Sequence, residues 1–132
     1  MSTRNMLAIK YKDGTVVGMW QHFNGEPSWM MSVLNDGVGF AEEDLAKELI
    51  KFGQCEAVYN KDYYEDRKDR YSEDQITHLS NGGIILAGSG SPKEYKNLRE
   101  CFSEDIAYLY VWKEGGYRWA VIDGAMLDEL RE

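Results

Sequence analysis

Hydrophobic and polar positions alternate in two runs near the start of the chain and in two more near its end. The first pair, residues 6–11 and 15–22, flanks Asp13-Gly14, and the second pair, residues 106–112 and 117–122, flanks a turn with two glycines. Such dipeptides supply the positive φ angles that tight turns between antiparallel strands require. The pattern therefore predicts two β-hairpins that join in one small antiparallel sheet.

Apolar residues recur at helical spacing in four other segments: 27–34, 41–52, 92–101 and 126–131. Proline stands at the start of the first segment, where a helix tolerates it, and Gly53 follows the second at the expected C-terminal cap. The third segment follows Ser91 in a Ser-Pro-Lys-Glu run, which has the form of a capping box. We therefore expect an α+β fold in which two to four helices pack on the sheet, as a single domain over residues 1–132.

Two segments lack a clear period. Residues 61–74 hold ten charged residues of both signs and three tyrosines, and we expect a mobile surface excursion there. Residues 81–91 are rich in glycine and serine around three apolar residues, which predicts a loop that carries a short strand. Neither segment has the amphipathic pattern of a core element.

The composition is that of an acidic globular domain. Hydrophobic residues make up 43% of the 132 positions, and 15 basic against 23 acidic residues give a net charge of −8. That field repels polyanions, so direct nucleic-acid binding is not expected. The two cysteines have no paired spacing, and the first residues lack the apolar stretch of a signal peptide. We therefore expect a cytoplasmic protein that does not enter a membrane.

Residues of the usual catalytic and metal sites are sparse. His22 and His78 are the two histidines of the sequence, and they are too far apart to resemble a zinc-ligand pair. Neither cysteine stands in a nucleophile motif. We therefore expect no catalytic residues, no metal and no cofactor, and keep a small enzyme acting on nucleotides as an alternative.

A glycine-rich stretch from Gly83 to Ser89 approaches the pattern of a phosphate-binding loop but lacks its lysine. Gly88 and Ser89 nevertheless precede the predicted helix at 92–101, where free backbone N–H groups favour an anion. Phosphate contact and plain helix capping are both open here.

The C-terminal hairpin concentrates aromatic residues on one face. Regular alternation puts Tyr110, Trp112 and Trp119 on one side of the two strands and aliphatic residues on the other. The aromatic face is either a second core under the loops or a platform for a ligand or partner. Arg118 falls on the aliphatic side and should reach an edge, where it could meet a phosphate or carboxylate.

The run from Trp20 to Pro27 passes from a strand through a tight turn into a helix. It carries His22, Asn24 and Gly25, and polar groups at such junctions often line a pocket. The alternative is that these residues only fix the turn by hydrogen bonds.

Both ends of the chain carry motifs of a known group of proteins. Met-Ser-Thr-Arg at residues 1–4, Asp13-Gly14 and the run His-Phe-Asn-Gly-Glu-Pro at residues 22–27 resemble a family of small bacteriophage proteins, most of them uncharacterised. The helix before Gly53 and the aromatic hairpin at 108–119 are similar to later elements of that family. The resemblance implies no enzymatic activity, and it implies the cytoplasm of a bacterial host as the location.

Small phage proteins without enzyme motifs often counteract host defence, which gives an expectation by analogy. We expect a non-catalytic sponge that binds a nucleotide second messenger by aromatic stacking and positive contacts. The alternative is an acidic inhibitor that docks on a host defence protein, and a homo-oligomer is left open. The expected ligand-binding residues are Arg4, Trp20, His22, Asn24, Gly25, Gly88, Ser89, Tyr110, Trp112, Arg118 and Trp119.

Overall fold

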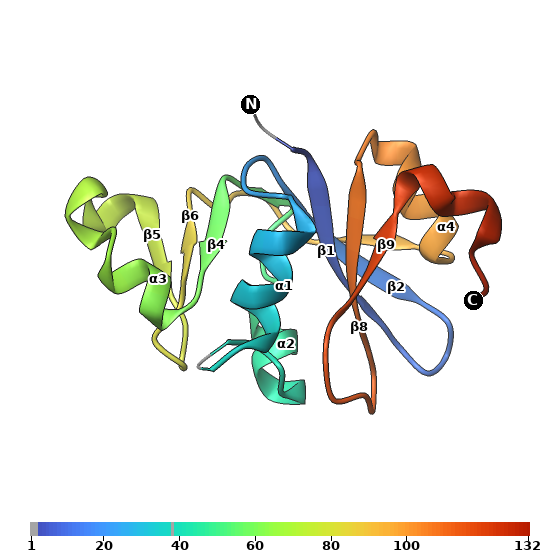
Figure 1. Ribbon diagram of the computed structural model, residues 1–132, viewed down its shortest axis with the longest axis horizontal. Helices are drawn as coiled ribbons and strands as arrows, with labels where there is room; N and C mark the ends of the chain where they lie inside the picture. The colour runs from blue at the N-terminus through green and yellow to red at the C-terminus, as the bar shows by residue number, and fades with distance from the viewer. Residues whose placement is uncertain (1–2, 38) are drawn as a thin grey trace.

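A computed structural model describes residues 3–37 and 39–132 of the chain. Two β-sheets with helices packed on them form an α+β fold, as the sequence predicts (Figure 1). The strands are β1 (Asn5–Lys10), β2 (Val16–Gln21), β3 (Gln54–Cys55), β4 (Ala57–Tyr59), β5 (Ile76–His78), β6 (Ile84–Leu86), β7 (Lys93–Tyr95), β8 (Tyr108–Lys113) and β9 (Ala120–Asp123). The α-helices are α1 (Pro27–Asn35), α2 (Glu43–Leu49), α3 (Lys61–Glu65) and α4 (Leu98–Cys101). The 3-10 helices are η1 (Lys68–Arg70), η2 (Glu73–Gln75), η3 (Phe102–Glu104) and η4 (Gly124–Glu129).

The main sheet joins the two predicted hairpins. Its strand order is β3-β2-β1-β8-β9, with β7 also paired to β2. Both hairpins are antiparallel, but β1 and β8 run in the same direction, with Asn5 opposite Tyr108 and Lys10 opposite Lys113. The expectation of a purely antiparallel sheet was therefore wrong. A long connection between the hairpins, which carries α1, α2 and the small sheet, allows β8 to pair with β1 in parallel.

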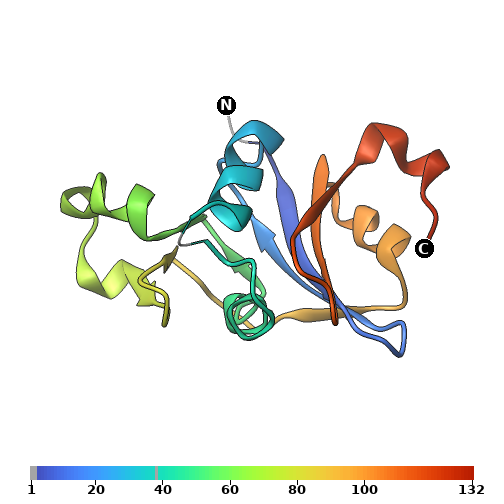
Figure 2. The same ribbon diagram turned by 60° about the horizontal axis from the view of Figure 1, so that its bottom comes forward.

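The main sheet is covered on both faces. Leu7 and Ile9 of β1 pack with residues of α1 and α2, whereas Met6 and Ala8 of the same strand pack with α4 and the C-terminal segment. Figure 2 shows β1 and β2 between these two groups of helices. Because alternate residues of β1 enter both cores, the strand is apolar almost throughout, as expected for the centre of a two-sided sheet.

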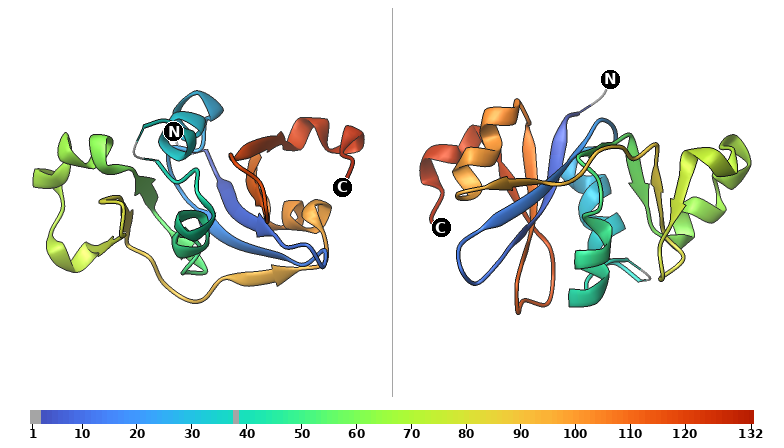
Figure 3. Two further views of the ribbon diagram at one scale, coloured as in Figure 1. Left: turned by 90° about the horizontal axis from the view of Figure 1, so that it is seen from below. Right: turned by 180° about the vertical axis from the view of Figure 1, so that it is seen from behind.

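A smaller sheet, in the order β4-β6-β5, lies at one end of the molecule together with α3, η1 and η2 (Figure 3). We call this part, residues 57–86, the lobe. Its core holds Ala57, Tyr59, Ile84 and Leu86. The short strand expected within residues 81–91 is present as β6.

The charged segment 61–74 lies on the surface of the lobe, as expected, and none of its residues is buried. It folds into α3 and η1 and leads into η2, and its tyrosines Tyr63, Tyr64 and Tyr71 pack on the lobe core. Local capping explains the helices, since the Asn60 side chain accepts a hydrogen bond from the backbone N–H of Tyr63.

The predicted helix at 92–101 was wrong over its first half. Residues 93–95 form strand β7, which pairs antiparallel with β2, and helix α4 begins only at Leu98. The side chain of Asn97 accepts from the backbone N–H of Glu100 and provides the actual N-cap. Strand pairing at the free edge of β2 therefore outweighs the capping-box pattern that starts at Ser91.

The helix predicted over residues 41–52 is shorter than expected, because α2 ends at Leu49. Gly53 is not its cap. A Cβ added to Gly53 would lie 2.8 Å from the carbonyl oxygen of Ser91, so glycine is needed for a close approach of two backbones. The helix from Pro27 and a final helical turn, here η4, agree with the predictions.

Candidate functional site

The aromatic face of the C-terminal hairpin is a second core. Tyr110, Trp112 and Trp119 are each 0% exposed, and they pack under α1 and α2. Tyr110 Oη donates to the carbonyl of Gly25, and Trp119 Nε1 donates to the carbonyl of Phe40 at 3.1 Å. These three predicted ligand contacts are therefore closed to a stacking ligand, which corrects the platform interpretation in favour of its alternative.

The turn of the same hairpin is exposed. Tyr117 is 83% exposed, and Arg118 beside it is exposed as well, at the tip and not along the aliphatic face where alternation had put it. The strand β9 starts only at Ala120, so alternation does not extend to Arg118. Tyr117 and Arg118 thus form a projecting aromatic and cationic pair.

The C-terminal side of this turn is fixed by one residue of α1. Asn35 accepts a hydrogen bond from the backbone N–H of Trp119 at 2.8 Å, and its amide donates to the carbonyl of the same residue at 3.1 Å. Both backbone groups of Trp119 are held, and its ring is buried. The chain immediately after Arg118 is therefore anchored.

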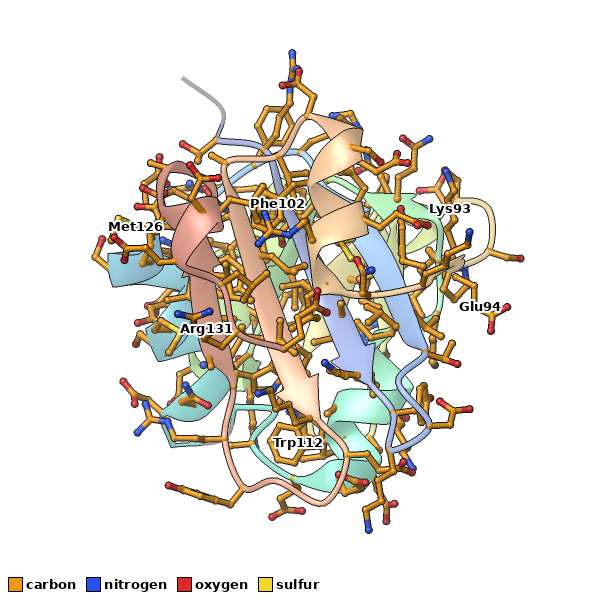
Figure 4. All side chains as sticks on the ribbon, turned by 90° about the vertical axis from the view of Figure 1, so that its right-hand side faces the viewer. Lys93, Glu94, Phe102, Trp112, Met126 and Arg131 are labelled. Carbon is orange, nitrogen blue, oxygen red and sulfur yellow. The ribbon has the colours of Figure 1, made fainter. Side chains whose placement is uncertain are left out.

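The N-terminal side is fixed by two glutamates. Glu43 accepts from Trp112 Nε1 and from the backbone N–H of Gly115, and the bond from Trp112 lowers the pKa of this carboxyl. Glu114 accepts from the backbone N–H of Lys12 at 2.9 Å and lies 3.4 Å from Nζ of Lys47. We call residues 113–119 the braced turn; Trp112 marks its base in Figure 4.

Three other predicted residues meet at the opposite edge of the sheet. Trp20 packs edge-on against His22, with ring centroids 4.2 Å apart. Gln54 links the group, because its side chain lies 3.4 Å from Nε2 of His22 and donates to Ser89 Oγ at 3.2 Å. Beside them is a hollow of about 290 Å³ that Trp20, Gln54, Ser89 and Glu104 help to line.

This hollow is a poor anion site. The loop at 88–91 leads into strand β7 and not into a helix, so no helix N-terminus faces it. The backbone N–H of Ser89 already donates to Gln54 O, and Gly88 lies so close to the Phe52 ring that an added Cβ would meet it at 2.3 Å. The carboxylate of Glu104 in the lining adds negative charge. The phosphate-contact interpretation of Gly88 and Ser89 is therefore not favoured.

The remaining predicted residues have structural contacts. Arg4 pairs with Asp105 at 2.7 Å on the surface. Asn24 adopts a left-handed φ of 61° and its amide donates to Tyr59 Oη at 3.3 Å, which ties the turn to the lobe. A Cβ on Gly25 would lie 2.2 Å from the carbonyl oxygen of Thr3, so this position requires glycine.

A further group of residues lies where the lobe meets α1, and none of its members was among the predicted site residues. The guanidinium of Arg67 lies 5.1 Å from the ring of Trp29, 5.5 Å from that of Tyr59 and 5.8 Å from that of Tyr63. Tyr71 packs beside Tyr59, with ring centroids 6.3 Å apart. We call these five residues the arginine–aromatic cluster. Its signal in the sequence was the presence of tyrosines and an arginine within a charged run.

The reactive side chains are arranged for stability. Burial raises the pKa of Cys55 and of Cys101 to about 12, so both thiols stay protonated and unreactive at neutral pH. Throughout residues 3–37 and 39–132, no group of three or more His, Cys, Asp or Glu side chains is placed to hold a metal ion. Nor does this part of the chain contain a helix long and apolar enough to cross a bilayer.

No family model, curated protein or solved structure matches this chain. The resemblance to small phage proteins therefore stays a prediction from motifs. Two features of the structure bear on function: the braced turn and the arginine–aromatic cluster.

Proposed function

We propose that the protein acts by docking on another protein and not by catalysis, with the braced turn at the centre of the contact. The observation that carries the proposal is Tyr117, 83% exposed between two anchored stretches of backbone. A tyrosine combines a large apolar ring with a polar hydroxyl, and its place at an exposed tip suits insertion into a partner.

The composition and rigidity of the turn both favour protein recognition. Tyrosine and arginine are the residue types enriched at the energetic centres of interfaces, and Tyr117 and Arg118 stand side by side. Glu43, Glu114 and Asn35 hold the backbone before binding, so less conformational freedom is lost on association.

The partner class follows from charge and from the family resemblance. A net charge of −8 steers the chain toward a partner with a basic surface. The resemblance to small bacteriophage proteins makes a host defence protein the expected partner, in the cytoplasm of the bacterial host. This is the acidic-inhibitor alternative of the sequence analysis, and we favour it over a sponge at the hairpin because Tyr110, Trp112 and Trp119 are buried.

A photo-crosslinking experiment tests the proposal. A photoreactive phenylalanine analogue placed at position 117 should crosslink one host protein in a defence-active cell, and the same analogue at Met126, which is 49% exposed elsewhere on the surface, should not. Equal yields from both positions would contradict a specific role of the turn.

Affinity for the captured partner then gives the decisive comparison. Truncating a central interface residue costs about 2 kcal/mol, so Tyr117→Ala should weaken binding roughly 30-fold. The control Met126→Ala should bind like the unmodified chain. Unchanged affinity of Tyr117→Ala would refute the proposal, as would loss of binding in both variants.

A further inference from the structure

Arg67 is a cation held against aromatic rings, and no acidic partner is present among the described residues. Its side chain donates one hydrogen bond, from Nη1 to the carbonyl of Tyr63 at 3.2 Å. Within the described ranges 3–37 and 39–132, no carboxylate lies at ion-pair distance from it. The rings of Trp29, Tyr59 and Tyr63 thus fix the guanidinium and leave most of its N–H groups for an external acceptor.

A second donor group lies beside the guanidinium. Tyr71 Oη is 3.4 Å from Tyr59 Oη, which already accepts from the Asn24 amide. The hydrogen bond with Tyr59, followed by burial, raises the pKa of Tyr71, while the charges of Arg70 and Arg67 act in the opposite direction. The hydroxyl of Tyr71 is therefore protonated at neutral pH and near two guanidinium groups.

Charged residues of both signs surround the cluster. Arg67 and Arg70 act on the Tyr71 hydroxyl, and Lys68 is paired with Glu65 at 3.1 Å. The carboxylates of Asp62 and Asp66 line a separate hollow of about 230 Å³ on the side of Tyr63 that faces α1. Asp69, Glu73 and Asp74 lie in the same run, so the charge around the cluster is mixed, and the positive contributions that reach the Tyr71 hydroxyl come from Arg70 and Arg67.

We propose that the arginine–aromatic cluster binds the phosphate group of a small aromatic phosphate of the nucleoside monophosphate class. The fork of Arg67 matches two phosphate oxygens. The Tyr71 hydroxyl donates to a third when Tyr59 acts as the donor in the bond between the two hydroxyls, since either can do so. The ring of Tyr71 is half-buried, and its exposed part is where a base can stack. A carboxylate has only two oxygens and uses this set of donors less fully.

The site is independent of docking through the braced turn. It is built from the lobe and α1, and Figure 1 shows α3 at one end of the molecule and the β8-β9 hairpin toward the other. Asn24, expected from the sequence to bind the ligand, takes part indirectly by fixing Tyr59.

NMR titration of the full chain with four probes tests the site: inorganic phosphate, AMP, adenosine and acetate. AMP and inorganic phosphate should both shift the Arg67 Nε–H signal, and AMP should bind about five-fold or more tighter because its base stacks. Adenosine should bind more weakly than AMP. No shift at Arg67 or Tyr71 with either phosphate probe overturns the proposal, and acetate binding equal to that of phosphate overturns the assignment of the ligand class.

Two variants and a matched control complete the test. Arg67→Gln should weaken AMP binding about 10-fold or more, since a charge-assisted hydrogen-bond pair is lost. Arg99→Gln removes the same charge from α4, which carries no part of the cluster, and should leave binding unchanged. Tyr71→Phe removes a single hydroxyl without disturbing the rings and should weaken binding about three-fold or more, a readout that stands even if Arg67→Gln is poorly folded. If Arg67→Gln and Tyr71→Phe bind AMP as tightly as the control Arg99→Gln, the proposal is overturned.

Discussion

The chain has two aromatic groups, and they have opposite fates. The group on the C-terminal hairpin, Tyr110, Trp112 and Trp119, is fully buried, and its hydroxyl and indole N–H groups donate to backbone carbonyls or to Glu43. In the arginine–aromatic cluster, where the lobe meets α1, Tyr59 is buried but the other four residues are half-buried, and they include a cation that lacks an acidic partner in the described part of the chain.

The difference lies in what covers each group. Helices α1 and α2 close over the hairpin, so its aromatic face becomes core. The lobe has only three short strands and short helices, so its rings are shared between a small core and the surface. Aromatic content alone therefore does not mark a binding face, because the layers above it decide whether the rings are accessible.

The largest expected effect is on the buried group. Trp119→Ala removes a fully buried ring and should lower the free energy of unfolding by about 3–5 kcal/mol. A urea denaturation curve with an unchanged m value measures this loss. A loss below about 1 kcal/mol would show that the hairpin face is not the core described above.

A smaller effect is expected from the cluster. Arg67→Gln removes a cation packed against three rings, so it should lower the free energy of unfolding by roughly 1 kcal/mol. Thermal and urea unfolding should agree on this value. A loss as large as that of Trp119→Ala would mean that the cluster is a structural core, and the contrast between the two groups would fail.

The loss of stability at low pH tests the contact of Glu43, which joins buried Trp112 to Gly115 in the braced turn. Because the pKa of Glu43 is lowered in the folded state, its ionised form stabilises the fold above the ordinary pKa of 4.5, and that stabilisation is lost as the pH falls through the folded value. The melting temperature of the unmodified chain should therefore fall more steeply below about pH 5 than that of Glu43→Gln. Glu42→Gln, at an exposed neighbouring position, is the control and should follow the unmodified chain.

The smallest effect on stability is expected at the tip. Tyr117→Ala should change the free energy of unfolding by less than about 0.5 kcal/mol, because the ring is 83% exposed. Differential scanning calorimetry beside Trp119→Ala gives the contrast directly. A loss above about 1.5 kcal/mol would mean that Tyr117 is already used within the fold and is not free to meet a partner.

Local patterns predicted the hairpins because Asp13-Gly14 and the glycine pair near 115 specify their turns within a few residues. They could not predict the parallel pairing of β1 with β8, or the strand at 93–95, since both depend on which distant strand edge is free. In the same way, alternation correctly grouped Tyr110 with Trp112 but carried no information on the helices above them.

One group of site residues was predicted from the sequence, and the other was not. Trp20, His22 and Ser89 were expected to contribute to one site, and the fold does bring them together through Gln54. The arginine–aromatic cluster went unnoticed because Trp29 comes from a different segment than Arg67 and Tyr71. Only the tertiary fold brings the ring of Trp29 in α1 against Arg67, which lies in a charged run more than thirty residues later.

The parallel pairing of β1 with β8 also has a consequence for the order of folding. The first hairpin and the lobe can form from neighbouring residues, but one edge of β1 has no partner until the chain has been synthesised as far as Lys113. Pairings between such distant residues form slowly, and an unpaired apolar strand edge is a template for association with other chains. The pairing with β8 therefore completes the main sheet late, and until then the free edge of β1 is open to association with other chains.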